Sequence, residues 1–375
     1  MAKVEARSNR PTRPLWKRIL FSCVAGAVLL ALLEGSFTAF FVVRDVAREF
    51  ANAPEVASLK EDSHCQYDEE LGWINIPSTQ ITDFYEPGAS ITINADGVRG
   101  PSTDHSYTSE LDTFRVVCLG DSFTLGYGVD DRSTFARQLQ ERCTGIETIN
   151  MGQGGYSIGQ SFLWLRKLAP VLQPDVVVGV FIVEDFRRLL VTRTANGYAT
   201  PQFELDGTGV VVSNLPVPPR LPAGDLLVQR GVVSRSLLQH SSLARAVTAP
   251  FQTEAGDRDA QCLLLGSEII REIRAECRRN HSRFVLVITP TLPELHDRAM
   301  ISAYQMFSQV LRRFADKEGI PFHDLWQTFA DEEKTGKPLF LAEQFHHYNR
   351  DGNALVAESL ADWLPTVIEE WPTEQ

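Results

Sequence analysis

The chain has 375 residues, of which 43% are hydrophobic, and this composition excludes a globally disordered protein. The formal net charge of −12 argues against a nucleic-acid partner, because such a protein needs a basic face. The length allows one large domain with additional segments, or two small domains.

Six cysteines are spread along the chain, without the CxxC or Cys/His spacing that is typical of a metal site. We therefore expect no zinc. If the protein is exported, one or two disulfides could form, but the spacing does not say which cysteines would pair.

An apolar run covers residues 19–43 and contains one carboxylate, Glu34. A helix that crosses a bilayer needs roughly 20 apolar residues, so this run is long enough to span a membrane. Glu34 could be a functional acid within the membrane, but the sequence favours a position away from the bilayer centre or a partner helix that satisfies it. Basic residues precede the run at Lys3, Arg7, Arg10, Arg13, Lys17 and Arg18.

The positive-inside rule then predicts that residues 1–18 form a cytoplasmic tail and that everything after Val43 is exported. In a cell with two membranes the exported part would lie in the periplasm, and the anchor would lie in the inner or plasma membrane. A cleaved signal peptide is the alternative. The sequence favours an uncleaved anchor, because phenylalanines prolong the apolar run and no small-x-small cleavage site follows promptly.

Residues 44–111 contain few helical signals. Within them, residues 91–99 predict a strand, an Asp-Gly turn and a second strand. We expect this stretch to form a stalk with a small β element that packs on the main domain.

From Phe114 onward, short apolar runs alternate with amphipathic stretches. This alternation predicts a parallel sheet with helices on both faces, which is an α/β fold. The predicted strands are 114–119, 147–150, 176–181, 283–288 and 321–324. The predicted helices are 134–142, 161–172, 263–280, 303–318 and 351–363.

The alternation is broken between about residues 188 and 259, where paired strand-like runs and a proline cluster occur. A connection of this length is more typical of a functional insertion than of a plain loop. We expect a β-hairpin flap and a helix near the working edge of the sheet.

The first predicted strand ends at Gly120-Asp121-Ser122, which places a hydroxyl at the carboxyl edge of the sheet. Ligands bind at that edge in open α/β sheets. A helix that begins after Ser122 would point backbone N–H groups at the same place, so Ser122 is a candidate nucleophile for acyl transfer. The alternative is an ordinary helix-capping serine. The turn lacks the G-x-G-x-x-G pattern of a dinucleotide site, and no cofactor is expected.

A base for Ser122 must come from elsewhere in the sequence. His347 lies in a loop after the last predicted strand and just before the terminal helix, so this loop opens at the same sheet edge. The glycine-rich turn over residues 150–156 follows the second strand and would let backbone N–H groups approach a ligand. A surface loop and an ordinary βα turn are the respective alternatives.

Together these residues resemble the SGNH/GDSL hydrolase family over roughly residues 112–375, apart from the insertion. The resemblance implies a three-layer, flavodoxin-like sandwich in which Ser122 is the nucleophile, His347 is the base and the N–H of Gly155 contributes to the oxyanion hole. Asn349 and Gly352 match the rest of the histidine block. With the anchor, residues 67–73 and 94–99 resemble the membrane-anchored bacterial branch, which is linked with acylation or deacylation of cell-surface polysaccharide.

Two positions depart from the family pattern. Glu184 stands where the family has an asparagine that donates to the oxyanion, and a carboxyl can do this only if its surroundings keep it protonated. Gln344 stands where the family has the aspartate that orients the histidine. Glu343 could substitute for it if the loop is shifted, or if His346 rather than His347 is the base.

The resemblance implies an extracytoplasmic esterase that acts on an acyl ester or an acylated carbohydrate, with no cofactor. An O-acyltransferase would use the same residues, and a degenerate, non-catalytic protein that binds polysaccharide or a partner in the same cleft would explain both departures. Polysaccharide-assembly proteins of the cell envelope are possible partners of this branch.

Overall fold

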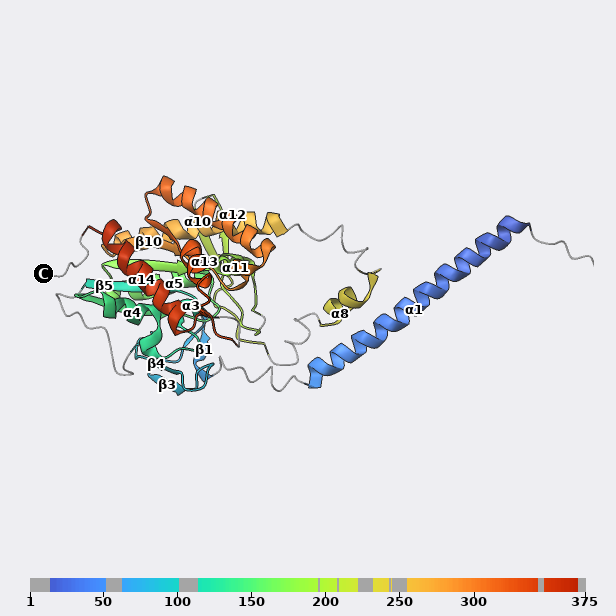
Figure 1. Cartoon of the computed structure of the whole chain (residues 1–375), viewed down its shortest axis with the longest axis horizontal. Coiled ribbons are helices and arrows are strands. Elements are labelled where there is room, and N and C mark those ends of the chain that lie inside the picture. Colours follow the sequence, from blue (N-terminus) through green and yellow to red (C-terminus); the bar gives the residue numbers. More distant parts are fainter. Residues whose placement is uncertain are drawn as a thin grey trace, which may run out of the picture. The chain divides into compact units, whose positions relative to one another are not determined.

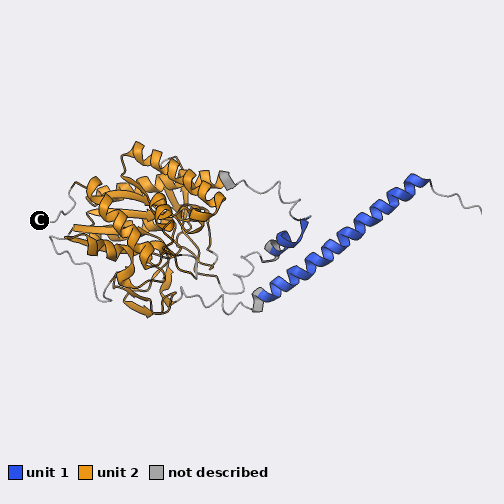
Figure 2. Ribbon diagram, viewed as in Figure 1, with its two compact units in different colours: residues 1–57, 223–252 blue, residues 58–222, 253–375 orange. Residues whose placement is uncertain are grey.

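The computed structural model forms two compact units, one with residues 1–57 and 223–252 and the other with residues 58–222 and 253–375 (Figure 1, Figure 2). We call them the anchor unit and the sheet unit. The residues that the structure describes are 14–51, 63–100, 114–194, 196–207, 209–221, 232–242, 244, 255–342 and 347–369.

The sheet unit is built on a five-stranded sheet in the order β11-β10-β7-β5-β6, and its paired strands are all parallel. The predicted parallel sheet is confirmed, and each predicted strand is present with ends that shift by no more than two residues. The strands are β5 (Phe114–Gly120), β6 (Ile146–Gly152), β7 (Val176–Phe181), β10 (Arg283–Ile288) and β11 (Phe322–Asp324).

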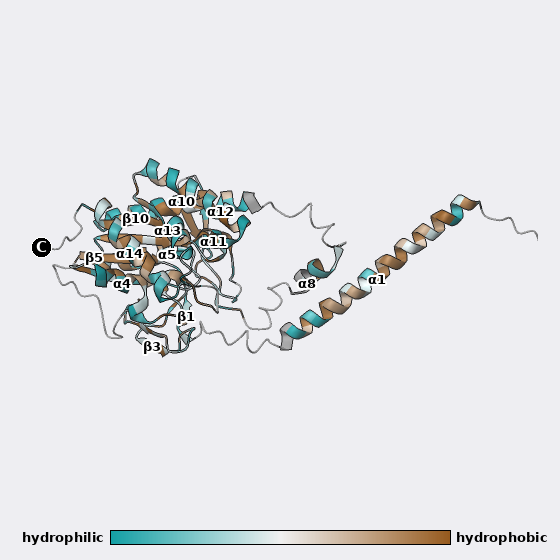
Figure 3. Cartoon of the chain, viewed as in Figure 1, coloured by the Kyte–Doolittle hydropathy of each residue, from teal (hydrophilic) through white to brown (hydrophobic). Residues whose placement is uncertain are grey.

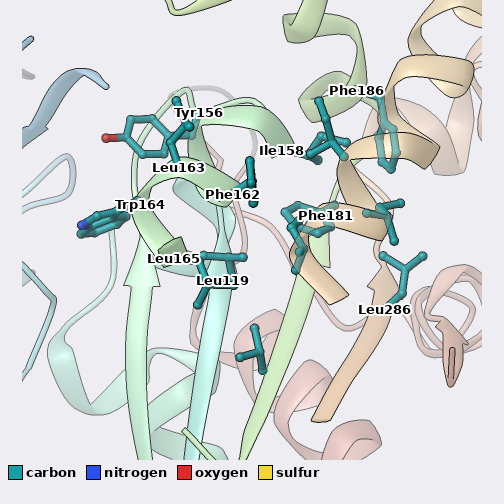
Figure 4. Close-up of a cluster of buried hydrophobic side chains, with 14 of the residues drawn as sticks. Leu119, Tyr156, Ile158, Phe162, Leu163, Trp164, Leu165, Phe181, Phe186 and Leu286 are labelled. Atoms are coloured by element: carbon teal, nitrogen blue, oxygen red, sulfur yellow. The ribbon is translucent and has the colours of Figure 1, made fainter. Parts of the chain in front are cut away.

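Helices cover both faces of this sheet, which makes three layers. Alternate residues of β5 point to opposite faces, so that Val117 and Leu119 join one core and Val116 and Cys118 join the other. One core includes α5 (Ile158–Leu172), α10 (Ala255–Arg279) and α12 (Arg298–Glu318), and part of it is drawn in Figure 4. The other core includes α4 (Phe135–Arg142), α13 (Trp326–Glu333) and α14 (Arg350–Val367).

The strand order fixes where a site can form. From β5 the chain moves outward to β6, and it then returns to place β7 on the other side of β5. A crevice opens at such a switch point, beyond the carboxyl ends of the two strands. Two short helices begin there: α3 (Ser122–Leu125) follows β5, and α6 (Val183–Arg187) follows β7.

Residues 63–100 form a small β element within the sheet unit. It pairs β1 (Cys65–Asp68) with β2 (Gly72–Asn75), and β3 (Thr79–Thr82) with β4 (Ser90–Ile93), both antiparallel. The predicted strand, turn and return are present, because β4 leads into a turn and Arg99 then bridges back to Ile93.

Arg99 connects this β element to the loop after α3. Its side chain is buried, and its guanidinium donates to Asp131 and to the carbonyls of Leu125 and Gly126. A buried charge with several acceptors holds its neighbours in one geometry. The β element therefore supports the region that follows Ser122.

The insertion divides between the two units. Its hairpin of β8 (Gln202–Leu205) and β9 (Val210–Ser213) belongs to the sheet unit, where Phe203 packs against Gly159 of α5. The expected helix is α8 (Val232–His240), but it belongs to the anchor unit and packs against α1. Its polar side chains Ser236 and His240 contact Asp45 of α1. The expected place of this helix near the working edge of the sheet stays a prediction.

Helix α1 (Leu15–Ala51) contains the whole predicted apolar run and is hydrophobic along most of its length (Figure 3). By length and composition it could cross a membrane, and a signal sequence would have the same properties. The six cysteines all lie in the described part of the chain and form no disulfide.

Candidate active site

Ser122 is held at the sheet edge by a turn that only small residues allow. A Cβ on Gly120 would lie 2.2 Å from Thr124 Oγ1 and 2.4 Å from the Val180 carbonyl oxygen. Asp121 caps α3 by accepting a hydrogen bond from the Phe123 N–H at 2.9 Å. Ser122 itself is 6% exposed, so its hydroxyl is almost covered.

His347 meets Ser122 as the sequence predicted. The Oγ of Ser122 lies 2.7 Å from Nε2 of His347, which is hydrogen-bond distance. The rings of Phe123 and Tyr127 pack against the imidazole, with centroid separations of 4.6 and 5.2 Å. The imidazole is therefore fixed by packing as well as by its hydrogen bond.

The rest of the histidine block has a structural role. Asn349 caps α14 by accepting hydrogen bonds from the N–H groups of Asp351 and Gly352. A Cβ on Gly352 would lie 2.2 Å from the Leu339 carbonyl oxygen, so the helix start needs glycine to pack this closely. These contacts position the loop that carries His347.

Glu343, Gln344 and His346 lie outside the described residues. The partner of the second imidazole nitrogen therefore stays a prediction, as does the choice between Gln344 and Glu343.

Gly155 lies in the turn after β6 and lines the same pocket as Ser122 and His347. Its φ of +75° is in the left-handed region that favours glycine. The carbonyl of the preceding Gly154 accepts a hydrogen bond from Nε1 of Trp73 at 2.9 Å.

Glu184 lines the pocket from the first turn of α6, and its side chain is exposed. The buried, apolar surroundings that an acidic donor would need at this position are therefore not present around Glu184. Its neighbour Asp185 is the buried carboxyl, and it accepts a hydrogen bond from the Ile182 N–H at 3.0 Å.

Arg188 bridges two carboxyls of the site. Its Nη1 lies 2.9 Å from Asp121 Oδ2 and 2.6 Å from Asp185 Oδ1. Burial raises the pKa of Asp185 well above its ordinary value, and the nearby Asp121 carboxylate raises it further, whereas the Arg188 charge opposes both. The positive charge of Arg188 thus compensates the negative charges of two buried carboxylates, whose charged forms the apolar surroundings disfavour.

The pocket that contains these groups has a volume of about 370 Å³. Trp73, Tyr127 and Tyr198 give it aromatic walls, and Thr194, Asn196 and Thr291 add polar groups. Asn196 and Tyr198 come from the insertion, whose broken periodicity was the only sequence signal for them. Trp73 comes from the β element, within a stretch that carried the family resemblance but no predicted role.

No family model matches the chain, and no curated protein matches it. Among solved structures, the chain is similar to a member of the lipolytic protein G-D-S-L family from Veillonella parvula, with 13% identity and a TM-score of 0.40 over 68% of this chain and 99% of that one. It is also similar to a catalytic mutant of an acetylxylan esterase from Geobacillus stearothermophilus, with 14% identity and a TM-score of 0.41 over 71% of this chain and 100% of that one. At these identities and TM-scores the likeness is distant, so the site's own geometry decides its chemistry.

The bridge made by Arg188 predicts a pH-dependent loss of stability when it is removed. Arg188→Met leaves two carboxyls buried without their cation, and we expect a loss of about 3 kcal/mol in the free energy of unfolding at neutral pH. Because the pKa of Asp185 is raised in the folded state, the loss should shrink as the pH falls and this carboxyl becomes protonated. Urea unfolding at several pH values measures both effects.

Arg166→Met is the matched control, because Arg166 forms an exposed ion pair with Glu70 at 3.1 Å. It should cost no more than about 1 kcal/mol at any of these pH values. Equal losses in the two variants, or a loss for Arg188→Met that does not change with pH, would contradict the bridge.

Proposed function

We propose that this chain is a membrane-anchored serine esterase of the SGNH/GDSL type, which removes O-acyl groups from cell-surface carbohydrate. The observation that carries the proposal is the 2.7 Å contact between Ser122 Oγ and His347 Nε2 within a pocket that Gly155 also lines. A nucleophile, a base and an oxyanion donor are the parts that acyl transfer requires.

The reaction has two halves. His347 Nε2 accepts the hydroxyl proton of Ser122 while Oγ forms a bond to the ester carbonyl carbon. His347 then returns that proton to the alcohol as the carbon–oxygen bond breaks, which leaves an acyl group on Ser122. Water attacks this ester in the same way, so that the acid leaves and the serine hydroxyl is restored.

The negative charge that develops on the carbonyl oxygen needs donors. The N–H groups of Gly155 and Ser122 are the proposed pair, and each such donor contributes about 10²–10³ in rate in comparable sites. Glu184 cannot donate as a carboxylate. The Asn196 amide and the Arg188 guanidinium are among the further groups of the pocket lining that are able to donate.

The pocket favours a small acyl group on a sugar. Aromatic walls bind the apolar faces of sugar rings and the acyl methyl, while hydroxyl and amide groups at the rim bind sugar hydroxyls. The resemblance of residues 67–73 and 94–99 to the membrane-anchored branch supports the same substrate class.

The proposed location follows from α1. As an uncleaved anchor through residues 19–43, it would leave residues 1–18 in the cytoplasm and the site outside, because the basic residues precede the apolar run. Polysaccharide-assembly proteins of the envelope are the partners we propose for an enzyme at this place.

The first test is covalent labelling. A fluorophosphonate should label the purified full chain, and Ser122→Ala should abolish both labelling and hydrolysis of aryl acetates. His347→Gln should lower kcat by about 10⁴-fold or more, because removing the base leaves only binding and the oxyanion donors. Ser213→Ala, at the exposed end of β9, is the control that should keep full activity.

Labelling that persists in Ser122→Ala would contradict the proposed nucleophile. A wild-type chain that neither labels nor hydrolyses esters would overturn the enzyme in favour of a binding protein. Acyl transfer to added oligosaccharide at the expense of hydrolysis would identify the chain as an acyltransferase that uses the same acyl-enzyme.

The second test concerns Glu184. Glu184→Asn restores a neutral amide at the wall of the pocket, and we expect kcat to rise by about 10-fold or more with little change in KM. Glu184→Gln, which removes the charge but lengthens the reach of the amide, should give a smaller rise. A fall in kcat for both variants would show instead that the carboxylate itself takes part in the reaction.

A further inference from the structure

The turn that carries Gly155 can adopt two arrangements. The N–H of Tyr156 donates to the carbonyl of Gln153 at 3.3 Å, so Gly154 and Gly155 are the central residues of a β-turn. Gly155 has a φ of +75°, and Gly154 is outside the positive-φ glycines of the described chain, which is the pattern of a type II turn. Rotation of the central peptide group converts this turn into type I.

That central peptide group contains the proposed oxyanion donor. The peptide is trans, so the Gly154 carbonyl and the Gly155 N–H point in opposite directions. Whatever holds the carbonyl therefore also sets the direction of the N–H. Two adjacent glycines provide no side chain that could do this themselves.

Trp73 holds the carbonyl from the β element. Its Nε1 donates to the Gly154 oxygen at 2.9 Å, and the indole is only 3% exposed. The indole is fixed in turn by the rings of Tyr156 and Tyr198, with centroids at 5.5 and 5.2 Å. A carbonyl that accepts a hydrogen bond also polarises its peptide and makes the N–H a better donor.

Tyr127 also contacts this turn. A Cβ on Gly154 would lie 1.8 Å from the Tyr127 hydroxyl oxygen, so the two are in close contact. The Tyr127 ring also packs against the imidazole of His347. The turn is therefore in contact both with Trp73 and with a residue that packs against the proposed base.

We propose that Trp73 is a positioning residue that sets the oxyanion hole by fixing the Gly154–Gly155 peptide in its type II orientation. The inference rests on the proposed esterase function. It makes the β element of residues 63–100 part of the catalytic apparatus, although the serine, glycine and histidine blocks of the family lie elsewhere in the chain.

The test is Trp73→Phe, which keeps an aromatic ring and removes the N–H. We expect kcat to fall by about 10- to 100-fold with KM nearly unchanged, since the N–H acts mainly in the transition state. A boronic acid that forms a tetrahedral adduct with Ser122 should lose affinity by a similar factor. Rotation of the peptide should also speed amide hydrogen exchange in residues 153–156, measured by mass spectrometry on the full chain.

Trp164→Phe is a closely matched control. Trp164 is fully buried in α5, and its Nε1 has no hydrogen-bond partner in the described structure. It should leave kcat, boronate affinity and exchange in residues 153–156 unchanged. Equal effects in the two variants, or an effect of Trp73→Phe on KM alone, would overturn the positioning role. The exchange measurement needs no activity, so it tests Trp73 even if the esterase proposal fails.

A second, independent observation concerns α1 and the insertion. Glu34, Thr38, Phe41 and Asp45 are spaced by four, three and four residues, so they lie on one face of α1. A carboxylate among apolar side chains in a bilayer costs about 3 kcal/mol unless it finds partners. Glu34 is therefore stabilised only if polar groups contact this face of α1.

Residues 236–242 of the insertion supply those groups. The hydroxyls of Ser241 and Ser242 donate to Glu34 Oε1 at 3.1 and 2.9 Å. The Thr38 hydroxyl donates to the His240 carbonyl at 3.2 Å, and the His240 ring stacks on Phe41 with centroids 4.6 Å apart.

The contacts continue toward the end of α1. The Ser236 hydroxyl donates to Asp45 Oδ2 at 2.6 Å, and His240 Nε2 lies 3.2 Å from the same oxygen. Each polar side chain of the face thus has a partner of matching chemistry. We infer that residues 236–242 are the docking partner of this face, so that this segment of the insertion is attached to the anchor helix.

Photocrosslinking in native membranes tests this attachment. A benzoylphenylalanine at position 41 of the full chain should crosslink to a peptide from residues 232–242, because the Phe41 ring stacks on His240. The control position is Val43, which is 68% exposed and lies about 200° around the helix from Phe41. Glu34→Leu should lower the yield at position 41 several-fold.

Crosslinks from position 41 to lipid alone, equal yields at positions 41 and 43, or crosslinks that join two copies of the chain would each overturn the inference. None of these outcomes depends on the chemistry at Ser122, so this attachment and the esterase proposal stand or fall separately.

Discussion

The site depends on how closely the turn after β5 approaches its neighbours. Gly120 lies against the Val180 carbonyl, and a Cβ on Gly152 would lie 2.0 Å from the Leu125 backbone nitrogen. Neither strand could carry a larger residue without moving α3 outward. Because both positions are glycine, α3 packs closely against the ends of the strands, and the Oγ of Ser122 lies within hydrogen-bond distance of His347.

This close packing also explains how the acidic residues divide their roles. Asp121 belongs to the first family block, yet its carboxylate caps α3 and pairs with Arg188, and Asp185 caps the start of α6. Both are buried, and both share one cation. Glu184 is the acidic residue that faces the pocket, so the departure from the family falls on a position that can change without disturbing the fold.

The sequence predicts well those features that depend on local pattern, such as the strands of the central sheet. The strands are continuous apolar runs because both faces of the sheet are covered, and Ser122 follows the carboxyl end of β5 while His347 lies just before α14. The bond from Trp73 to Gly154 could not be predicted, because it joins a side chain to a backbone carbonyl 81 residues away, and a backbone carbonyl has no residue signature. The need of Glu34 for a partner was predictable, but its partners lie 207 and 208 residues further along the chain.

The motifs and the accessory segments therefore have different roles. The family blocks bring the Ser122 hydroxyl and the His347 imidazole into contact, and Gly155 lines the same pocket. Trp73 from the β element and Asn196 and Tyr198 from the insertion form the walls around them. The insertion has two parts. Asn196 and Tyr198 line the pocket, and α8, further along the same insertion, packs against α1.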